Sequence, residues 1–271
     1  MKNQIVIYAD KGVDGVSLKH LVYSLKQELN PEMKIKRLDA RSVIEENWEK
    51  DTQLFIIPGG RDVFYQSALA GKGTDKIRSY VKEKGNYLGI CAGAYFASAR
   101  IEFEKGTNLE VLDERSLCFF SGMAKGTAYG VGKYTYNSSK GACSALINWL
   151  NRPLHVYFNG GCFFSPSRPS EAKVLSCYLD LPQPYPAIVE IEHGEGKVLL
   201  SGVHFEYLPD LLDRKDPYLS MIYSDLEKAN SFRREMLCDL LKRVGCLLKA
   251  SIVNGTCCLE TDMHGVLRRN K

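Results

Sequence analysis

The sequence has few of the features that mark secreted, membrane-spanning or zinc-binding proteins. Its nine cysteines follow no evenly spaced framework and include no paired C-x-x-C motif, which argues against a disulfide scaffold and a zinc site. The N-terminal apolar run is too short for a signal peptide, and no stretch reaches the length that spans a membrane. We therefore expect a cytoplasmic protein with reduced cysteines and no metal or other cofactor.

The sequence also lacks long linkers, internal repeats and dense basic runs. Its 36 Lys and Arg against 32 Asp and Glu give a net charge of only +4, so neither nucleic acid nor a membrane is expected as a partner. A hydrophobic content of 45% is ordinary for a globular protein. We expect one domain over residues 1–271, with a core at about 3–248 and a weakly patterned extension at 250–271. A small-molecule substrate or ligand is expected, and the oligomeric state is left open.

The first half of the sequence alternates between strand and helix patterns. Short apolar runs with β-branched residues predict buried strands, and apolar residues at helical spacing predict amphipathic helices. This alternation is typical of a parallel sheet covered by helices on both faces. The expected strands are residues 4–9, 33–38, 53–57 and 87–90, and the expected helices are residues 17–29 and 75–84.

The second half predicts more strands and one long helix. Residues 105–169 are rich in Gly, Ser, Tyr and Phe and show short alternating patterns, with a helical turn expected at 144–150. An amphipathic helix is expected at 224–244, ended by Gly245. Further strands are expected at residues 172–178, 187–192 and 197–202, the last two joined by a hairpin turn at 193–196.

The pattern Gly-Ile-Cys-Ala-Gly at residues 89–93 joins a predicted strand to a helix-compatible segment. Such a tight turn, called a nucleophile elbow, lifts one side chain clear of the sheet, here Cys91. Gly89 and Gly93 suit this turn because larger side chains would collide with the backbone. The helix N-terminus that follows favours a thiolate. Most free cysteines are merely small buried residues, so Cys91 needs a base from elsewhere in the sequence.

A candidate base and its orienting acid follow the predicted strand at 197–202. His204 and Glu206 are two residues apart, and in an extended chain their side chains point the same way. Glu206 would then hold the His204 imidazole, which in turn would serve Cys91. For His204 alone, a satisfied, partly buried histidine is the alternative. The other histidines are expected to be structural or solvated: His20, His155, His193 and His264.

Backbone N–H groups complete the predicted site. The N–H of Ala92, next to the nucleophile, is the expected first donor to an oxyanion. The second is expected from Gly59 or Gly60, because glycine lets the backbone approach a ligand closely. A plain turn at the end of a strand is the alternative for the Pro-Gly-Gly sequence at residues 58–60. Both loops follow strands, where the active sites of parallel sheets lie.

These motifs, in this order and spacing, resemble class I glutamine amidotransferase-like proteins. More narrowly, the chain is similar over about residues 3–248 to the N-terminal domain of eukaryotic-type biotin–protein ligases, which also occurs as a stand-alone protein. The resemblance implies a flavodoxin-like three-layer α/β sandwich with a mostly parallel central sheet, and a triad of Cys91, His204 and Glu206. It does not imply biotin ligation, because the adenylate loop of the separate ligase domain is not found. The segments that carry it are residues 56–62, 87–95, 136–142, 157–161 and 202–206.

One position departs from the superfamily pattern. Glutaminases of this superfamily usually carry Gln two positions after the second elbow glycine, where it helps to bind glutamine, whereas this chain has Tyr95. Tyr95 therefore puts glutamine in doubt as the substrate. Asn159 and the loop at 134–141 are expected to line the substrate pocket, with glycine-rich connections between strands as the alternative.

Three functional hypotheses follow from these residues. The first is a cysteine-nucleophile hydrolase or amidotransferase-like enzyme that acts on a small amide or related carbonyl compound. The second, motivated by Tyr95, is a non-catalytic ligand-binding or regulatory module that keeps a triad-like pocket. The third is a redox or carbonyl-stress protein, because elbow cysteines also occur in that neighbouring branch. The His-x-Glu sequence after a strand favours the first hypothesis over the third.

Overall fold

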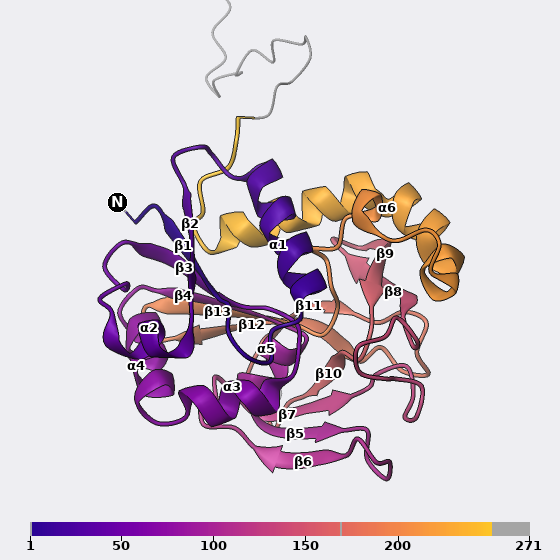
Figure 1. The fold of residues 1–271 in the computed structure, drawn as a ribbon, viewed down its shortest axis with the longest axis horizontal. Coiled ribbons are helices and arrows are strands. Elements are labelled where there is room, and N and C mark those ends of the chain that lie inside the picture. The colour runs from indigo at the N-terminus through magenta and orange to yellow at the C-terminus, as the bar shows by residue number, and fades with distance from the viewer. Residues whose placement is uncertain (1, 169, 251–271) are drawn as a thin grey trace, which may run out of the picture.

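The centre of the molecule is a seven-stranded sheet in the order β11-β12-β13-β4-β3-β1-β2 (Figure 1). The structure is a computed structural model that describes residues 2–168 and 170–250. Neighbouring strands from β13 to β2 are parallel, and β12 and β11 extend one edge in antiparallel pairs. The strands are β1 (Gln4–Tyr8), β2 (Lys34–Leu38), β3 (Thr52–Ile57), β4 (Asn86–Ile90), β11 (Lys173–Cys177), β12 (Pro186–His193) and β13 (Gly196–Ser201).

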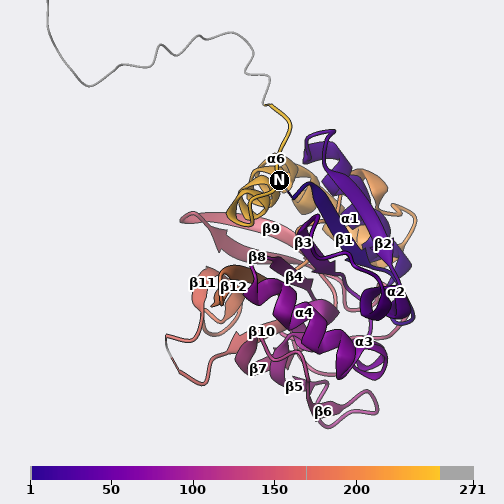
Figure 2. The same cartoon turned by 90° about the vertical axis from the view of Figure 1, so that its left-hand side faces the viewer.

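Helices cover both faces of this sheet, so the predicted three-layer α/β sandwich is confirmed (Figures 1 and 2). The inner strands are apolar on both faces, as a covered parallel sheet requires: in β1, Ile7 packs on one side and Val6 on the other. One face carries α1 (Gly15–Glu28) and α6 (Pro217–Arg243), and the other carries α2 (Ala40–Glu45), α3 (Asp62–Leu69), α4 (Lys72–Lys82) and α5 (Ala92–Phe96).

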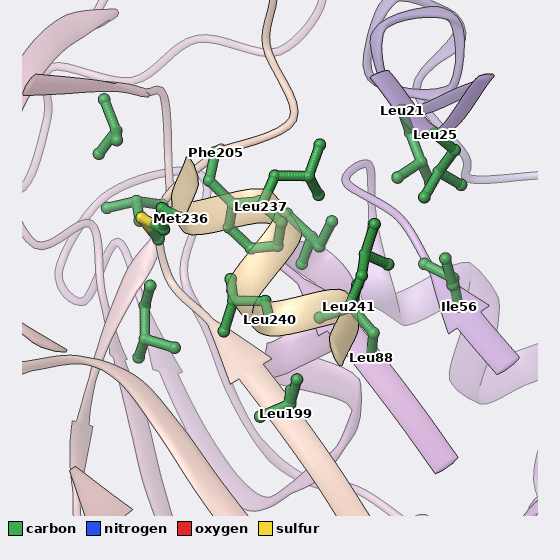
Figure 3. Packing of buried hydrophobic residues seen from close by; sticks show 14 of the residues in the cluster. Leu21, Leu25, Ile56, Leu88, Leu199, Phe205, Met236, Leu237, Leu240 and Leu241 are labelled. Atoms are coloured by element: carbon green, nitrogen blue, oxygen red, sulfur yellow. The ribbon is translucent and has the colours of Figure 1, made fainter. Parts of the chain in front are cut away.

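The long helix α6 supplies much of the core on its face of the sheet. Its residues Leu237, Leu240 and Leu241 are almost fully buried and pack with Leu88 of β4 and Leu199 of β13 (Figure 3). The helix begins at Pro217, well before the predicted start at 224. Its start is set by the Asp216 side chain, which accepts the N–H groups of Tyr218 and Leu219, and by proline at the first helical position.

A second sheet lies beside α3 and α5, with the strand order β10-β7-β5-β6 (Figures 1 and 2). Its inward-facing residues Ile101, Phe120 and Phe164 join the core on that side of the central sheet. The sequence patterns had not placed these strands individually. They are β5 (Ser98–Phe103), β6 (Val111–Glu114), β7 (Phe120–Gly126) and β10 (Cys162–Ser165).

The prediction of a helical turn at residues 144–150 is wrong. This segment is β8 (Cys143–Trp149), which pairs antiparallel with β9 (Arg152–Phe158). Ala145, Ile147 and Trp149 are buried, and the residues between them are partly exposed, which is the two-residue period of a strand. The weakly patterned extension predicted at 250–271 lies, apart from its first residue, outside the described residues.

The ends of three neighbouring strands meet at one edge of the central sheet. Ile57 of β3 is in register with Gly89 of β4, and Ile90 is in register with Ser201 of β13. The loops that follow these strands therefore lie side by side, as the sequence predicted. In the part of the chain that the structure describes, no helix is long and apolar enough to cross a bilayer.

The turn between β4 and α5 has no room for a larger residue at either elbow glycine. A Cβ atom on Gly93 would lie 2.0 Å from the Ile57 carbonyl oxygen, and one on Gly89 would lie 2.5 Å from the Gly93 carbonyl oxygen. A glycine at each position is thus a steric requirement of this turn.

We predict that Gly93→Ala lowers the free energy of unfolding by about 2 kcal/mol or more, because the new methyl group collides with backbone that cannot move aside. Gly15→Ala is the matched control, since nothing lies within 4 Å of its Cβ position at the start of α1. It is expected to be neutral or slightly stabilising. Urea unfolding of the three proteins measures both effects, and equal stability of the two variants would contradict the prediction.

Candidate active site

Cys91 occupies a strained position between β4 and α5. Its φ of 50° and ψ of −105° lie outside the regions that non-glycine residues favour, a strain of order 1–3 kcal/mol that structures tend to retain at functional sites. Its backbone N–H donates to the Ser201 carbonyl of the adjacent strand at 2.8 Å. The Cys91 side chain is largely buried but lines a cavity. These are the features of a nucleophile elbow.

His204 and Glu206 form a buried hydrogen-bonded pair at the end of β13. The distance from His204 Nδ1 to Glu206 Oε1 is 2.7 Å, and Glu206 is fully buried. The segment turns rather than continuing as a strand, and its position is fixed by the His204 N–H, which donates to the Tyr157 carbonyl of β9 at 2.9 Å. Because the Nδ1 atom bonds to the Glu206 carboxylate, the Nε2 atom is the ring nitrogen that remains available to a group in the cavity.

Opposing effects act on the pKa of the His204 imidazole. Burial lowers this pKa, because an imidazolium loses its hydration inside the protein. The Glu206 carboxylate and the neighbouring Cys91 sulfur outweigh burial and raise the pKa of His204 to about 10. At neutral pH the ring therefore carries a proton, and a cationic imidazole is the form that stabilises a nearby thiolate.

Three residues that the sequence analysis did not single out surround Glu206. Ser17 donates from its hydroxyl to Glu206 Oε1 at 3.3 Å, and Ser24 donates to the Glu206 carbonyl at 2.7 Å. The Arg233 guanidinium, almost fully buried in α6, donates to the Phe205 carbonyl at 2.8 Å. The sequence offered one signal for the two serines. Both lie on the buried face of α1, seven residues apart, where apolar side chains are the rule.

The two glycines of the predicted oxyanion turn differ in what their N–H groups do. The Gly59 N–H donates to Ser17 Oγ at 3.2 Å, so it is already engaged. Within the described part of the chain, the N–H groups of Gly60 and Ala92 have no hydrogen-bond acceptor. Gly60 and Ala92 line the same small hollow beside Cys91, which leaves these two groups as the candidate oxyanion donors.

Cys91 opens onto a large cavity of about 880 Å³. Of the other predicted site residues, Gly59, Gly60, Asn159 and His204 also line it, whereas Glu206 lies behind His204. The Asn159 carbonyl accepts a long hydrogen bond from the Cys91 thiol at 3.9 Å. Members of the predicted 134–141 loop complete one wall: Tyr134, Tyr136, Asn137, Ser138 and Ser139.

Tyr95 lies on the other side of Cys91, away from the large cavity. Its side chain is buried, and its hydroxyl donates to the Gly160 carbonyl at 3.2 Å. It lines a hollow of only about 20 Å³, together with Gly60, Cys91 and Ala92. This space holds about one water molecule, so Tyr95 closes the region beneath the elbow.

Two further residues of the cavity wall carry polar groups without protein partners. His20 is buried in α1 and stacks on Tyr207 with ring centroids 4.1 Å apart. Its Nδ1 accepts the Leu208 N–H, and its Nε2 has no partner among the described residues. The Arg61 guanidinium lies 4.0 Å above the Tyr136 ring, and no carboxylate of the described residues forms an ion pair with it. His20 was expected only to be structural or solvated, yet it also lines the cavity.

The fold places the chain in a known structural class. A crystal structure of a glutamine amidotransferase matches with a TM-score of 0.53 and 19% identity, over 83% of this chain and 98% of that one. The chain thus has the class I glutamine amidotransferase-like fold that its motifs predicted.

Within this class, the chain belongs to the family described as "Biotin-protein ligase, N terminal", whose model matches residues 3–261. An uncharacterized protein of Chlamydia muridarum is 39% identical over 89% of this chain and 95% of its own length. A biotin–protein ligase of Schizosaccharomyces pombe is 33% identical over 89% of this chain, which spans 38% of that ligase.

The raised pKa of His204 predicts how its pair with Glu206 contributes to stability. A folded-state pKa near 10, against an ordinary value of 6.5, means that the contribution is full below about pH 6.5 and is lost as the pH rises towards 10. Glu206→Gln removes the carboxylate charge. The stability difference between wild type and this variant should therefore be largest near pH 6 and shrink towards pH 10, as measured by urea unfolding.

Glu45→Gln is the control for this pH series, because Glu45 is exposed and its one ion pair among the described residues is a surface pair with Arg41. Its stability difference from wild type should be small and flat over the same pH range. A Glu206→Gln difference that does not change with pH would contradict the prediction.

Proposed function

We propose that this protein is a cysteine-nucleophile hydrolase, of the amidotransferase-like kind, that cleaves an amide or related carbonyl bond of a small substrate. The observation that carries the proposal is the arrangement at the strand ends. Cys91 in its strained turn and His204, whose Nδ1 atom lies 2.7 Å from Glu206 Oε1, line one cavity. A nucleophile, a general acid or base and an orienting acid are the groups that covalent hydrolysis of a carbonyl bond needs.

In the first half of the proposed reaction, the Cys91 thiolate attacks the carbonyl carbon of the substrate. The carbonyl oxygen becomes an oxyanion, which accepts hydrogen bonds from the N–H groups of Gly60 and Ala92. The carbon–nitrogen bond then breaks as His204 gives its proton to the leaving amine. Glu206 keeps the imidazole oriented throughout, and the product of this half is a thioester on Cys91.

In the second half, water attacks the thioester. Neutral His204 takes a proton from the water, and a second oxyanion forms at the same two N–H groups. The carbon–sulfur bond breaks, the Cys91 thiolate is restored beside a protonated His204, and the carboxylic acid leaves. Atoms and charge balance over the two halves, and no cofactor takes part.

Tyr95 argues for a substrate other than glutamine. Its side chain closes the region beneath the elbow, where glutaminases of the superfamily carry a glutamine-binding Gln, and the hollow that remains is about 20 Å³. The substrate must therefore enter through the large cavity, between Ser17, Tyr157 and the loop at 134–141. We assign no biotin-ligase step to this chain, which spans 38% of the ligase it resembles.

A ligand-binding module without turnover is the second candidate, and the same closure by Tyr95 favours it. In that case the cavity of about 880 Å³ binds a small molecule, and the strained cysteine is an inherited feature. Binding then survives Cys91→Ser, and no amide or ester is turned over by the wild-type protein.

We predict that limiting iodoacetamide at about pH 6 alkylates Cys91 at least about tenfold faster than Cys118, because the protonated His204 imidazole lies beside the Cys91 sulfur. Cys118 is the comparator within the same chain. The residue as a whole is exposed, but its sulfur is partly buried, and this burial raises the pKa of its thiol. Peptide mapping reports both rates. An equal or slower rate at Cys91 would remove the basis for an activated nucleophile.

Turnover separates the two candidate functions. Release of ammonia, amine or alcohol from a panel of small amides and esters is measured with wild type and with Cys91→Ser. We expect hydrolysis of at least one compound by wild type and a loss of about a thousandfold or more in the variant. A compound that raises the melting temperature of both proteins and is never cleaved would favour the binding module.

A further inference from the structure

Ser17 lies between the two halves of the proposed site. It is on the first turn of α1 and is almost fully buried. Its hydroxyl accepts the N–H of Gly59 at 3.2 Å and donates to Glu206 Oε1 at 3.3 Å. A hydroxyl has a single proton to donate. Ser17 therefore donates that proton to Glu206 and accepts the Gly59 N–H with a lone pair of its oxygen.

Ser17 is itself held in place from its own backbone. The Asp14 side chain caps α1 and accepts the Ser17 N–H at 2.7 Å, and the Asp14 N–H donates to the Gly59 carbonyl at 3.0 Å. The start of α1 and the glycine turn are thus joined by backbone and side-chain bonds. These bonds fix the Ser17 backbone relative to the glycine turn.

The space around Gly59 leaves little freedom for the turn. A Cβ atom at Gly59 would lie 2.7 Å from His204 Cε1 and 2.9 Å from Ser17 Oγ. The imidazole and the hydroxyl therefore both pack closely against the Gly59 backbone. A small shift of the turn would change both the place of the Gly60 N–H and the space open to the His204 ring.

Glu206 depends on Ser17 as well. Its Oε1 atom receives the donors of His204 and Ser17, while Oε2 has no partner among the described residues. Removing the hydroxyl would leave the Gly59 N–H without its acceptor and the buried carboxylate with one side-chain donor. Buried polar groups that lose a partner tend to move until they find another.

We propose that Ser17 is a positioning residue that sets the Gly59–Gly60 turn against the His204–Glu206 pair, so that one hydroxyl aligns the oxyanion donor with the acid–base group. The inference rests on the proposed function, because it takes Cys91 to attack a carbonyl group. It predicts that loss of the hydroxyl harms reactions that pass through an oxyanion more than reactions that do not.

Two reagents make this distinction on the full-length protein without knowledge of the natural substrate. With iodoacetamide, the Cys91 sulfur displaces iodide at a saturated carbon, and no oxyanion forms. With p-nitrophenyl acetate, the sulfur attacks the ester carbonyl, an oxyanion forms, p-nitrophenolate leaves, and an acetyl thioester remains. The first rate measures the thiolate, and the second measures the thiolate together with the oxyanion donors.

We expect Ser17→Ala to slow acylation by about tenfold or more and alkylation by less than about threefold. Complete removal of an oxyanion donor lowers a reaction rate by about a hundredfold or more, and a displaced donor should cause a part of that loss. Ser98→Ala is the matched control. Ser98 of β5 is equally buried, and its hydroxyl donates to the Ala94 carbonyl at 3.0 Å rather than to a group of the proposed site. It should change neither rate by more than about twofold.

Ser17→Thr keeps the hydroxyl and should stay closer to wild type than Ser17→Ala, and it serves if the alanine variant does not fold. Equal losses in Ser17→Ala and Ser98→Ala, equal losses with both reagents, or an unchanged acylation rate would each overturn the positioning role. A wild-type Cys91 that reacts with neither reagent would instead overturn the proposed function, and this inference with it.

Discussion

The contact between Gly93 and the Ile57 carbonyl is the constraint on which the site depends. A Cβ atom on Gly93 would lie only 2.0 Å from the Ile57 carbonyl oxygen, which shows that the turn from β4 into α5 lies directly against the end of β3. That turn forces Cys91 into its positive-φ conformation and brings it beside the loop that follows β3. The adjacent strand, β13, then delivers His204 from the other side. The position of the sulfur is thus a result of close backbone packing rather than of contacts made by its own side chain.

The second constraint on the site is electrostatic and concerns the buried carboxylate of Glu206. Glu206 is fully buried, and a carboxylate in such a place is tolerated only where donors surround it. His204 and Ser17 provide those donors from two distant parts of the chain. The same carboxylate keeps the imidazole protonated, which burial alone would prevent. The stability of the buried pair and the proposed activation of Cys91 therefore depend on the same carboxylate.

Local patterns were enough to predict the central sheet, the helices α1, α4 and α6 and the residues at the strand ends. The Cys91 turn and the His-x-Glu sequence are short-range motifs, and their meeting follows from the rule that parallel strands end at one edge. Where the sequence misled, a local signal was ambiguous: residues 144–150 form a strand because alternate burial, visible only in the fold, decides their period. Ser17 was missed because its partners lie 42 and 189 residues away, and no local rule predicts such contacts.

The strand order also has a consequence for how the molecule is made. β13 is among the last strands in the chain, yet it lies inside the sheet, between β4 and β12. A growing chain completes the β4 elbow early and must wait for the strand that carries the histidine, an interval on the order of ten seconds during synthesis. Until then the sheet has an open edge beside β4, and Cys91 has neither His204 nor Glu206 beside it. The proposed site is therefore absent from the nascent chain and forms only when nearly all of the central sheet has been made.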